Sequence, residues 1–516
     1  MSLIGPATTA AATGEDRTTR PVEQVEQESV EQESVEQERR AQAKPSRNQV
    51  LDKDSRAIRR AVDEKDIVGH LRRLEEIADR TGDRAAGRPG YAAGSRYIEN
   101  QLKKAGYKPK RQYFDFTYTS VNKDDLTVDG EALEHIIMEG SVGTDGPVTG
   151  PLVAPTDPLG CTDAAWTGVD ATDGVALVSR GTCSFAEKAA AAGAAGAAVV
   201  VIYNNAEGEL NGTLGGETGL PPTTGITQAD GTALLAQLAE GPVEATADFD
   251  VTVEQRRTWN VITTTKRGDR DNTVMLGAHL DGVQDHAGIN DNGTGSAALL
   301  ETAIALKKTG LEKKLRNNIR FAWWGAEEIG LLGSTHYVNE LVTKRPKALD
   351  KIAVYLNYDM VGSPNYVISV YDADESTYEA EAPVPPGSAQ TERAYRRYFK
   401  ATKQPVVDTE FSGRSDYQAF INNGVPSGGI FTGADGVKTE REQQLFGGRA
   451  GVIYDPNYHT EGDTLKNVNR KALRITSDAI AHITVKLGKN TKGISQVRPG
   501  PKKVVKPALR EGLVRR

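Results

Sequence analysis

The sequence lacks the features of a membrane-spanning or nucleic-acid-binding protein. Its 516 residues contain no run of about 20 uninterrupted apolar residues, so no segment is predicted to span a membrane. The formal net charge is −7, which provides no overall basic field for nucleic acid. Residues 1–13 lack both a basic region and a hydrophobic stretch, so no signal peptide is evident.

Cysteine is scarce: only Cys161 and Cys183 are present. They could be two free buried thiols. Alternatively, they could form one disulfide closing a loop of about 20 residues, which would contribute ~3 kcal/mol. The short spacing within a region rich in Gly, Ala and Thr favours the disulfide, which would indicate an oxidising compartment.

Composition divides the chain into four parts. Residues 1–55 contain Val-Glu-Gln repeats and residues 491–516 are rich in Lys, Arg, Pro and Gly, so both ends are predicted to be disordered. Short apolar runs broken by Gly, Pro and Thr predict a small β-rich domain over residues 126–251, without a catalytic cluster. Residues 56–125 and 252–490 are predicted to form one catalytic domain, into which that small domain is inserted.

The catalytic domain is predicted to be α/β. Apolar runs that indicate buried strands alternate with helical patterns, and they cover residues 274–278, 319–324, 352–357 and 428–431. Such alternation predicts a mixed, mainly parallel central sheet with helices on both faces. Residues 55–118 are expected to add two helices and an edge strand to the same sheet.

Acidic and histidine side chains follow three of these strands directly. In an open parallel sheet, ligands bind at the carboxyl ends of the strands, so these side chains should meet at one edge. They are His279 and Asp281 after the first strand, Glu327 and Glu328 after the second, and Asp359 after the third. Loops add Asp291 and His459 to the same set.

This set suits two zinc ions bridged by a carboxylate. We expect His279, Asp291 and Asp359 to hold one ion. Asp291, Glu328 and His459 would hold the other, with Asp291 as the bridge.

Two further acids would act around the metals. Glu327 is expected to take the proton of the attacking water and pass it to the leaving amine. Asp281 would accept the proton on the second ring nitrogen of His279 and so fix its tautomer.

Each of these features alone is commonly structural: an acidic pair favours a helix dipole, and an Asn-Asp-Asn-Gly segment is usually a turn. Their common position at one sheet edge is what favours a metal site. Residues 293–298 fit a loosened dinucleotide fingerprint, but no strand precedes them immediately and no acid is placed to hold a ribose. The sequence has neither a His-Glu-x-x-His motif nor a convincing Gly-x-Ser-x-Gly elbow.

At these residues the sequence resembles the co-catalytic di-zinc aminopeptidases, in particular the Streptomyces-type secreted leucine aminopeptidases. The resemblance covers about residues 65–120 and 255–490. The matching segments are His70–Gly90, Gln101–Tyr107, Gly277–Asp281, Ala287–Ala297, Arg320–Glu328, Leu356–Met360, Gly362–Asn365, Gly413–Asp416 and Tyr454–His459.

The resemblance implies further roles. Tyr458 is expected to stabilise the oxyanion of the tetrahedral intermediate, and Arg414 to help position the peptide. Phe431 and Met360 would line the pocket for an apolar first side chain. Glu327 and Asp359 would also help hold the free α-amine of the substrate. A strained, cis peptide bond is expected between Asp291 and Asn292.

One departure from the family concerns the last histidine. The family look-alike has cysteines on both sides of it, whereas this sequence has Asn457 and Gly462. The loop that carries His459 therefore lacks a disulfide. The family also allows a calcium ion near the ends of the domain, for which the sequence assigns no ligands.

The inserted region resembles a protease-associated domain, through residues Asp173–Phe185, Ala194–Tyr203 and Thr224–Gly231. This resemblance strengthens the prediction of a Cys161–Cys183 disulfide. Such domains usually act as lids or substrate-access modules, although a spacer without effect on catalysis is a close alternative.

The sequence therefore predicts a secreted, monomeric exopeptidase with two zinc ions that removes apolar N-terminal residues from peptides with a free N-terminus. No nucleic-acid partner and no membrane span are expected. Three alternatives use the same fold: a di-zinc carboxypeptidase, a non-catalytic receptor-like ectodomain and a one-zinc glutaminyl cyclase. The complete ligand set with Glu327 argues against the receptor, and the bridging Asp291 argues against the cyclase.

Overall fold

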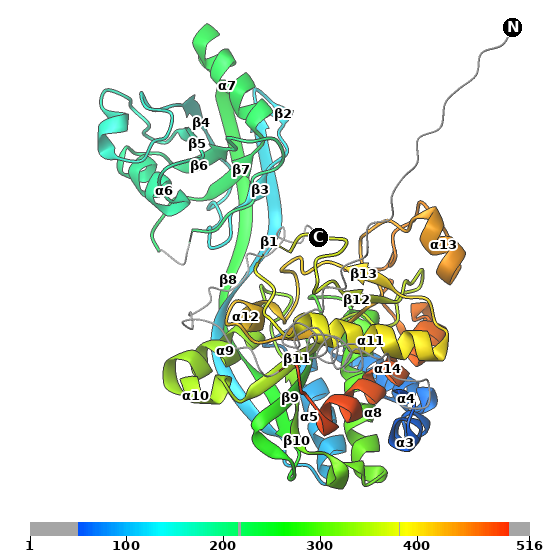
Figure 1. Cartoon of the computed structure of the whole chain (residues 1–516). Coiled ribbons are helices and arrows are strands. Elements are labelled where there is room, and N and C mark those ends of the chain that lie inside the picture. Colours follow the sequence, from blue (N-terminus) through cyan, green and yellow to red (C-terminus); the bar gives the residue numbers. More distant parts are fainter. Residues whose placement is uncertain (1–49, 215–217, 381, 495–516) are drawn as a thin grey trace, which may run out of the picture. The chain divides into compact units, whose positions relative to one another are not determined.

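The computed structural model describes residues 50–214, 218–380 and 382–494, and Figure 1 shows the chain. The described residues from Leu51 onward belong to one compact unit. Most of the two ends that we predicted to be disordered, 1–49 and 495–516, lies outside the described residues. Within the predicted segment 1–55, however, α3 already begins at Lys53, where the Asp52 side chain accepts a hydrogen bond from the main-chain N–H of Ser55.

The catalytic part is built on a mixed, mainly parallel sheet, as predicted. Its order is β13-β12-β14-β11-β9-β10-β8, and β1 pairs with the outer side of β8. The strands β9, β10, β11 and β14 are mutually parallel, while β1, β8 and the β12–β14 pair supply the antiparallel contacts. Their bounds are β1 Lys110–Val128, β8 Glu244–Thr264, β9 Asp269–His279, β10 Asn317–Trp324, β11 Ile352–Tyr358, β12 Ser369–Tyr371, β13 Val407–Thr409 and β14 Ser427–Phe431.

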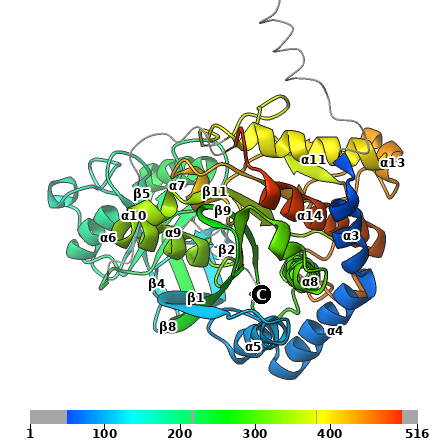
Figure 2. The ribbon, with the colours of Figure 1, turned by 60° about the horizontal axis from the view of Figure 1, so that its bottom comes forward.

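Helices cover both faces of this sheet, and Figure 2 shows α8, α4 and α5 on one side of β9 and β11 and α9 with α10 on the other. The first layer consists of α3 Lys53–Ala61, α4 Glu64–Thr81, α5 Pro89–Lys104, α8 Gly295–Lys308, α11 Ser388–Thr402 and α14 Arg470–Lys489. The second consists of α9 Leu332–Lys344, α10 Pro346–Leu349 and α12 Gln418–Ile421. A further short helix is α13 Glu440–Phe446.

The hydrophobic pattern explains these layers. The face of α4 predicted from the sequence is buried, with Ile67, Leu71 and Leu74 fully inaccessible to solvent. Every residue of β11 is buried as well, which is why its sequence reads as a continuous apolar run. On the opposite face of the sheet, a buried cluster that includes Trp324 and Tyr355 packs under α9 and α12.

The inserted segment adds a smaller set of elements: β2 Glu131–Ala132, β3 Ile136–Ile137, β4 Val148–Val153, β5 Val175–Ser179, α6 Phe185–Ala194, β6 Val199–Tyr203, β7 Thr223–Ile226 and α7 Gln228–Glu240. The strands from β4 to β7 are parallel neighbours. The long strands β1 and β8 pair along nearly their whole length, from Lys110 opposite Ile262 to Val128 opposite Ala245. The predicted boundaries at 125/126 and 251/252 therefore lie inside two continuous strands, and the division into domains stays a prediction.

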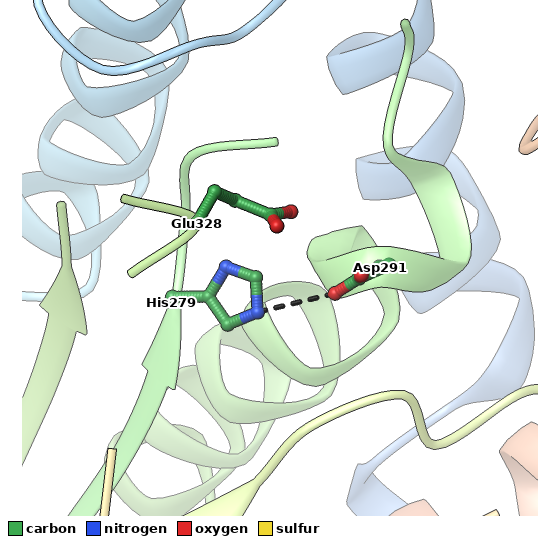
Figure 3. A group of neighbouring side chains, drawn as sticks. All are labelled: His279, Asp291 and Glu328. Carbon is green, nitrogen blue, oxygen red and sulfur yellow. Dashed lines mark ion pairs between the residues drawn. The ribbon is translucent and has the colours of Figure 1, made fainter. Parts of the chain in front are cut away.

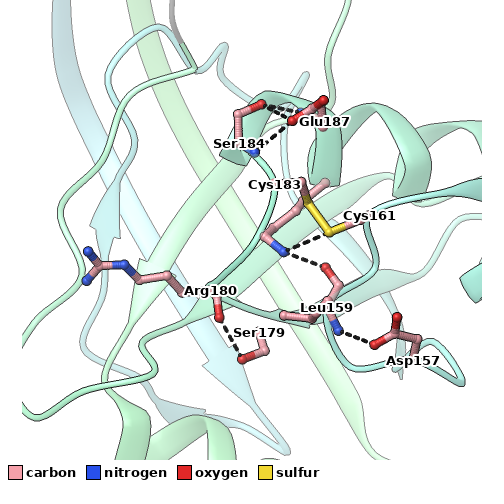
Figure 4. Close-up of a disulfide and its surroundings, with 9 residues drawn as sticks. Asp157, Leu159, Cys161, Ser179, Arg180, Cys183, Ser184 and Glu187 are labelled. Carbon is pink, nitrogen blue, oxygen red and sulfur yellow. Dashed lines mark hydrogen bonds between the residues drawn. A yellow bond between two sulfur atoms is a disulfide. The ribbon is translucent and has the colours of Figure 1, made fainter.

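The predicted disulfide joins Cys161 and Cys183, as Figure 4 shows. Beside it, the buried ammonium of Lys188 donates to the main-chain oxygen of Leu159 at 2.6 Å and lies 3.6 Å from the sulfur of Cys161. The bridge thus ties the loop before β5 to the start of α6. Among the described residues, no helix is both long and apolar enough to cross a membrane.

Candidate metal centre

Three strand ends deliver acidic and histidine side chains to one edge of the sheet. His279 is the last residue of β9, and its neighbours β10 and β11 run parallel to it. Glu327 and Glu328 follow the end of β10, and Asp359 follows the end of β11. Parallel strands end at the same edge, so this placement follows from the topology.

The first group of side chains surrounds the ring of His279. Its Nε2 lies 3.2 Å from Oδ1 of Asp291 and 3.1 Å from Oδ1 of Asp359. Oε2 of Glu327 lies 3.9 Å from the same nitrogen. In Figure 3, His279, Asp291 and Glu328 converge on one point from different elements, and their ligand atoms all lie within 4.8 Å of one another.

The second group surrounds the ring of His459. Its Nε2 lies 3.2 Å from Oδ2 of Asp291 and 3.1 Å from Oε2 of Glu328. The Asp291 carboxylate therefore faces one histidine with each of its oxygens. All five predicted metal-binding residues are thus brought together, in two groups that share Asp291.

The chemistry of these groups fits bound cations. His279, Asp291 and Glu327 are buried, and burying several carboxylates together is costly unless positive charge accompanies them. Burial would by itself lower the pKa of His279, but the carboxylates of Asp359 and Glu327 raise it well above its ordinary value. Burial raises the pKa of Glu327 well above its usual range. Imidazole nitrogen and carboxylate oxygen are the ligands that zinc prefers.

Asp281 lies directly behind this centre. The main-chain oxygen of Asp281 is 3.2 Å from Nδ1 of His279, whereas its carboxylate oxygen Oδ1 is 3.8 Å from the same nitrogen. The Asp281 carboxylate instead accepts the main-chain N–H groups of Glu327 at 3.2 Å and Glu328 at 3.3 Å. The predicted contact with the second ring nitrogen of His279 is therefore made more closely by the main-chain carbonyl of Asp281 than by its carboxylate. The carboxylate instead holds the Glu327–Glu328 turn.

Two buried charged residues that the sequence reasoning missed hold the Asp291 loop. The Asp463 carboxylate accepts the main-chain N–H groups of Asn290 at 2.6 Å and Asp291 at 2.9 Å. The fully buried guanidinium of Arg84 donates to the carbonyl of Ala287 at 2.9 Å and to those of Leu280 and Gly288. Arg84 thus joins the segment after His279 to the segment before Asp291. Neither residue lies at a strand end, so the pattern that identified the ligands did not identify them.

The peptide bond between Asp291 and Asn292 is cis, as the family resemblance implied. The Asn292 side chain anchors the turn on both sides. Its Oδ1 accepts the N–H of Gly295 at 2.9 Å, and its Nδ2 donates to the carbonyl of Tyr358 at 2.9 Å.

A cavity of about 310 Å³ opens next to the metal centre. Its lining includes all of the predicted substrate-binding residues, Met360, Arg414 and Phe431, together with Tyr458. The Arg414 guanidinium is held by Asp435 through hydrogen bonds of 3.2 and 3.0 Å.

Tyr458 lines this cavity together with residues of the metal centre. Its ring stacks on that of His459, with the centroids 3.8 Å apart. Burial and the nearby carboxylates of Asp291 and Glu328 raise the pKa of Tyr458 far above its ordinary value, so its hydroxyl stays protonated. The hydroxyl can therefore act as a hydrogen-bond donor beside the carboxylates.

Hydrogen bonds close the loop of His459 where the family look-alike has cysteines. The amide Nδ2 of Asn467 donates to the carbonyl of Gly462 at 2.6 Å and to Oδ1 of Asn457 at 3.3 Å. Oδ1 of Asp455 accepts the main-chain N–H of Asn457 at 2.9 Å. Asn467 was not identified from the sequence, because it lies outside the motif that ends at His459.

Fold and site together define a zinc aminopeptidase. Peptidase family M28 matches residues 260–484, and the PA domain matches residues 148–234. The chain is 44% identical over 389 residues to a probable leucine aminopeptidase 2 of Aspergillus fumigatus, covering 75% of each chain. The structure is similar to that of an aminopeptidase from Aneurinibacillus sp. strain AM-1, with 28% identity, a TM-score of 0.63, and coverage of 88% of this chain and 98% of that one.

A zinc aminopeptidase from Bacillus subtilis is also similar, with 26% identity, a TM-score of 0.54, and coverage of 86% of this chain and 99% of that one. The chain thus belongs to peptidase family M28 and is a zinc-dependent aminopeptidase that carries a PA domain. The predicted enzyme class and the predicted PA domain are confirmed.

The role of Asn467 in placing His459 can be tested by substitution. Asn467→Ala removes both bonds that close the loop, at a cost of about 1–3 kcal/mol for the groups left unpaired. We expect kcat/KM for leucine p-nitroanilide to fall about tenfold and zinc to dissociate faster. Asn422→Ala removes an amide just after α12 that accepts a hydrogen bond from Gln418; it is the matched control and should leave both unchanged.

A rescue variant separates positioning from general destabilisation. A Cβ atom at Gly462 would lie 3.3 Å from that of Asn457, just below the roughly 3.5–4.5 Å found in disulfides. Adding Asn457→Cys and Gly462→Cys to the Asn467→Ala variant should restore activity under oxidising conditions and lose it again with a thiol reductant. Full activity of Asn467→Ala alone would contradict the role.

Proposed function

We propose that the centre binds two zinc ions bridged by Asp291. His279 and Asp359 complete one site, and Glu328 and His459 complete the other. The observation that carries this proposal is the division of one carboxylate between two histidines, at 3.2 Å each. A single ion would use only one of these groups and would leave the other as a buried cluster of acids around an imidazole.

Each residue of the site has a defined task in peptide hydrolysis. Zinc, when bound, polarises the scissile carbonyl and lowers the pKa of water. Glu327 accepts the proton of the attacking water and then delivers it to the leaving amine. The Tyr458 hydroxyl, which stays protonated, donates a hydrogen bond to the oxyanion that develops on the carbonyl.

The same geometry explains removal of one residue at a time. Glu327 and Asp359 lie close to His279 and line the cavity, where their carboxylates can receive the free α-amine of the substrate. Met360 and Phe431 line the cavity beside them and favour an apolar first side chain. Arg414, held by Asp435, would position the peptide beyond the first residue.

We also propose that the protein acts outside the cell as a monomer. The Cys161–Cys183 disulfide supports an oxidising compartment.

No calcium site is proposed. In the described part of the chain, the acidic group around Asp372 is the candidate calcium site outside the metal centre. Its carboxylate, however, already accepts hydrogen bonds from the main-chain N–H groups of Ser376, Thr377 and Tyr378.

Metal analysis tests the number of ions. Purified protein should contain close to two zinc ions per chain, and a chelator should abolish activity until zinc is restored. His459→Ala should lower the content to about one ion, because only the group around His279 stays complete. A wild-type protein with one ion and full activity would rule out the two-ion site.

Substitution of Glu327 tests the proton-transfer step. Glu327→Ala should retain its zinc but lose several orders of magnitude in kcat, because no other group takes the proton. Glu240→Ala, at the exposed end of α7, is the control and should match the wild type. Turnover by Glu327→Ala within tenfold of the wild type would remove Glu327 as the base.

A substrate panel tests the exopeptidase direction. Leucine peptides with a free N-terminus should be cleaved, and N-acetylated versions should be inert because they lack the amine that Glu327 and Asp359 receive. Peptides with an amidated C-terminus should be cleaved as fast as unmodified ones. Release of C-terminal residues from N-acetylated peptides would support the carboxypeptidase alternative instead.

A further inference from the structure

A second cavity lies at the opposite edge of the sheet from the metal centre. It has a volume of about 740 Å³ and is lined by the first residues of β1 and β10, the last residues of β8 and the C-terminal part of α9. Asn318 and Arg320 line it near the start of β10, whereas the metal centre follows the end of that strand. This second cavity, called the basic groove for the lysine and arginine side chains that line it, is therefore separate from the catalytic cavity.

The lining of the basic groove is strongly cationic. It contains one acidic residue, Glu340, and eight basic residues: Lys108, Lys110, Arg111, Lys266, Arg270, Lys307, Arg320 and Arg345. The whole chain has a net charge of −7, so this concentration of positive charge is local. A concave surface lined by one sign of charge focuses its field and attracts ligands of the opposite sign.

Carboxylates neutralise only part of this charge. Arg111 pairs with Glu99, Lys307 with Glu312, and Arg345 with Glu340. The other five cations of the groove form no ion pair with any residue in the described part of the chain: Lys108, Lys110, Lys266, Arg270 and Arg320. Four of them are exposed lysine or arginine side chains around the opening.

Arg320 is the cation whose placement argues most directly for a ligand. Arg320 is half-buried in β10, where an arginine is unfavourable unless a negative charge compensates its own. Its guanidinium donates to the Tyr337 hydroxyl at 2.5 Å, which is a neutral partner. The remaining donors of this guanidinium can bind an anion inside the groove.

We propose that the basic groove binds a polyanion whose charged groups are sulfate or phosphate groups. The guanidinium fork and the lysine ammonium groups match the tetrahedral oxyanions of such a ligand. The volume is that of a ligand with several charged groups. Sulfated sugars and polyphosphates share this chemistry, and the groove then acts as an anchoring site away from the zinc centre.

Nucleic acid fits the basic groove less well. Binding of single strands depends on aromatic side chains on which bases stack. The exposed aromatic ring of the lining is Tyr113, at 46% exposure. Its ring packs against Trp259 at 5.4 Å, and the Arg257 guanidinium lies over it at 5.2 Å.

Binding by charge-reversal variants tests the proposal. The groove variant combines Lys266→Glu with Arg270→Glu. The control variant combines Lys471→Glu with Arg474→Glu, two exposed cations at the start of α14 that do not line the groove. Both variants change the charge equally. Calorimetry with inorganic tripolyphosphate and with a heparin-type hexasaccharide should show at least tenfold weaker binding to the groove variant and less than twofold change for the control.

Further readouts distinguish the outcomes. Both variants should match the wild type in thermal melting and in turnover of leucine p-nitroanilide, because neither pair lines the catalytic cavity. The probe that binds more tightly to the wild type identifies the source of the anion. The proposal is overturned if neither probe binds at millimolar concentration, if both variants weaken binding equally, or if an octadeoxythymidylate binds more tightly than either probe.

Discussion

The position of the Asp291 carboxylate is the constraint on which the rest of the catalytic structure depends. Its two oxygens face His279 and His459, which come from a strand end and from a loop 180 residues apart in the chain. A carboxylate can serve two cations only if its direction is fixed. The Asp463 side chain supplies this by holding the main-chain N–H groups of Asn290 and Asp291, and Arg84 holds the carbonyls just before them.

The centre is also a concentration of buried negative charge. Asp281, Asp291 and Glu327 are all buried, and Arg84 is a buried cation next to them. Burial raises the pKa of Asp281 to about 7, although His279 and the N–H groups of Glu327 and Glu328 oppose the shift. Burying these charges together lowers the stability of the folded protein, and bound zinc supplies the opposing charge. The strand ends bring these side chains together, because β9, β10 and β11 are parallel neighbours in one sheet.

Much of this organisation could be predicted from the sequence, and the reason is topological. The continuous apolar runs before His279, Glu327 and Asp359 identify buried parallel strands, and parallel strands bring whatever follows them to one edge. The α/β fold and the strand ends were therefore predictable. The Cys161–Cys183 pairing was predictable because the chain has only these two cysteines, close together, and the resemblance to a protease-associated domain strengthened it. The cis bond at Asp291 came from family resemblance alone, because no local pattern specifies it.

Other contacts could not be predicted because they join residues that no periodic pattern connects. Arg84 reaches carbonyls about 200 residues away, and Asn467 closes a loop from outside its motif. The length of β1 was also missed: 19 residues alternate irregularly between exposed and buried positions, because the strand is stabilised by pairing with β8 rather than by its own pattern. The basic groove, which β1, β8, β10 and α9 form, likewise exists only after folding.

The central claim is that one carboxylate holds two ions, and anomalous diffraction at the zinc edge tests it most directly. Crystals of the protein should give two anomalous peaks about 3.5–4 Å apart. One peak should lie beside Oδ1 of Asp291 and His279, and the other beside Oδ2 of Asp291 and His459. A single fully occupied peak in crystals of active protein grown with excess zinc would contradict the account.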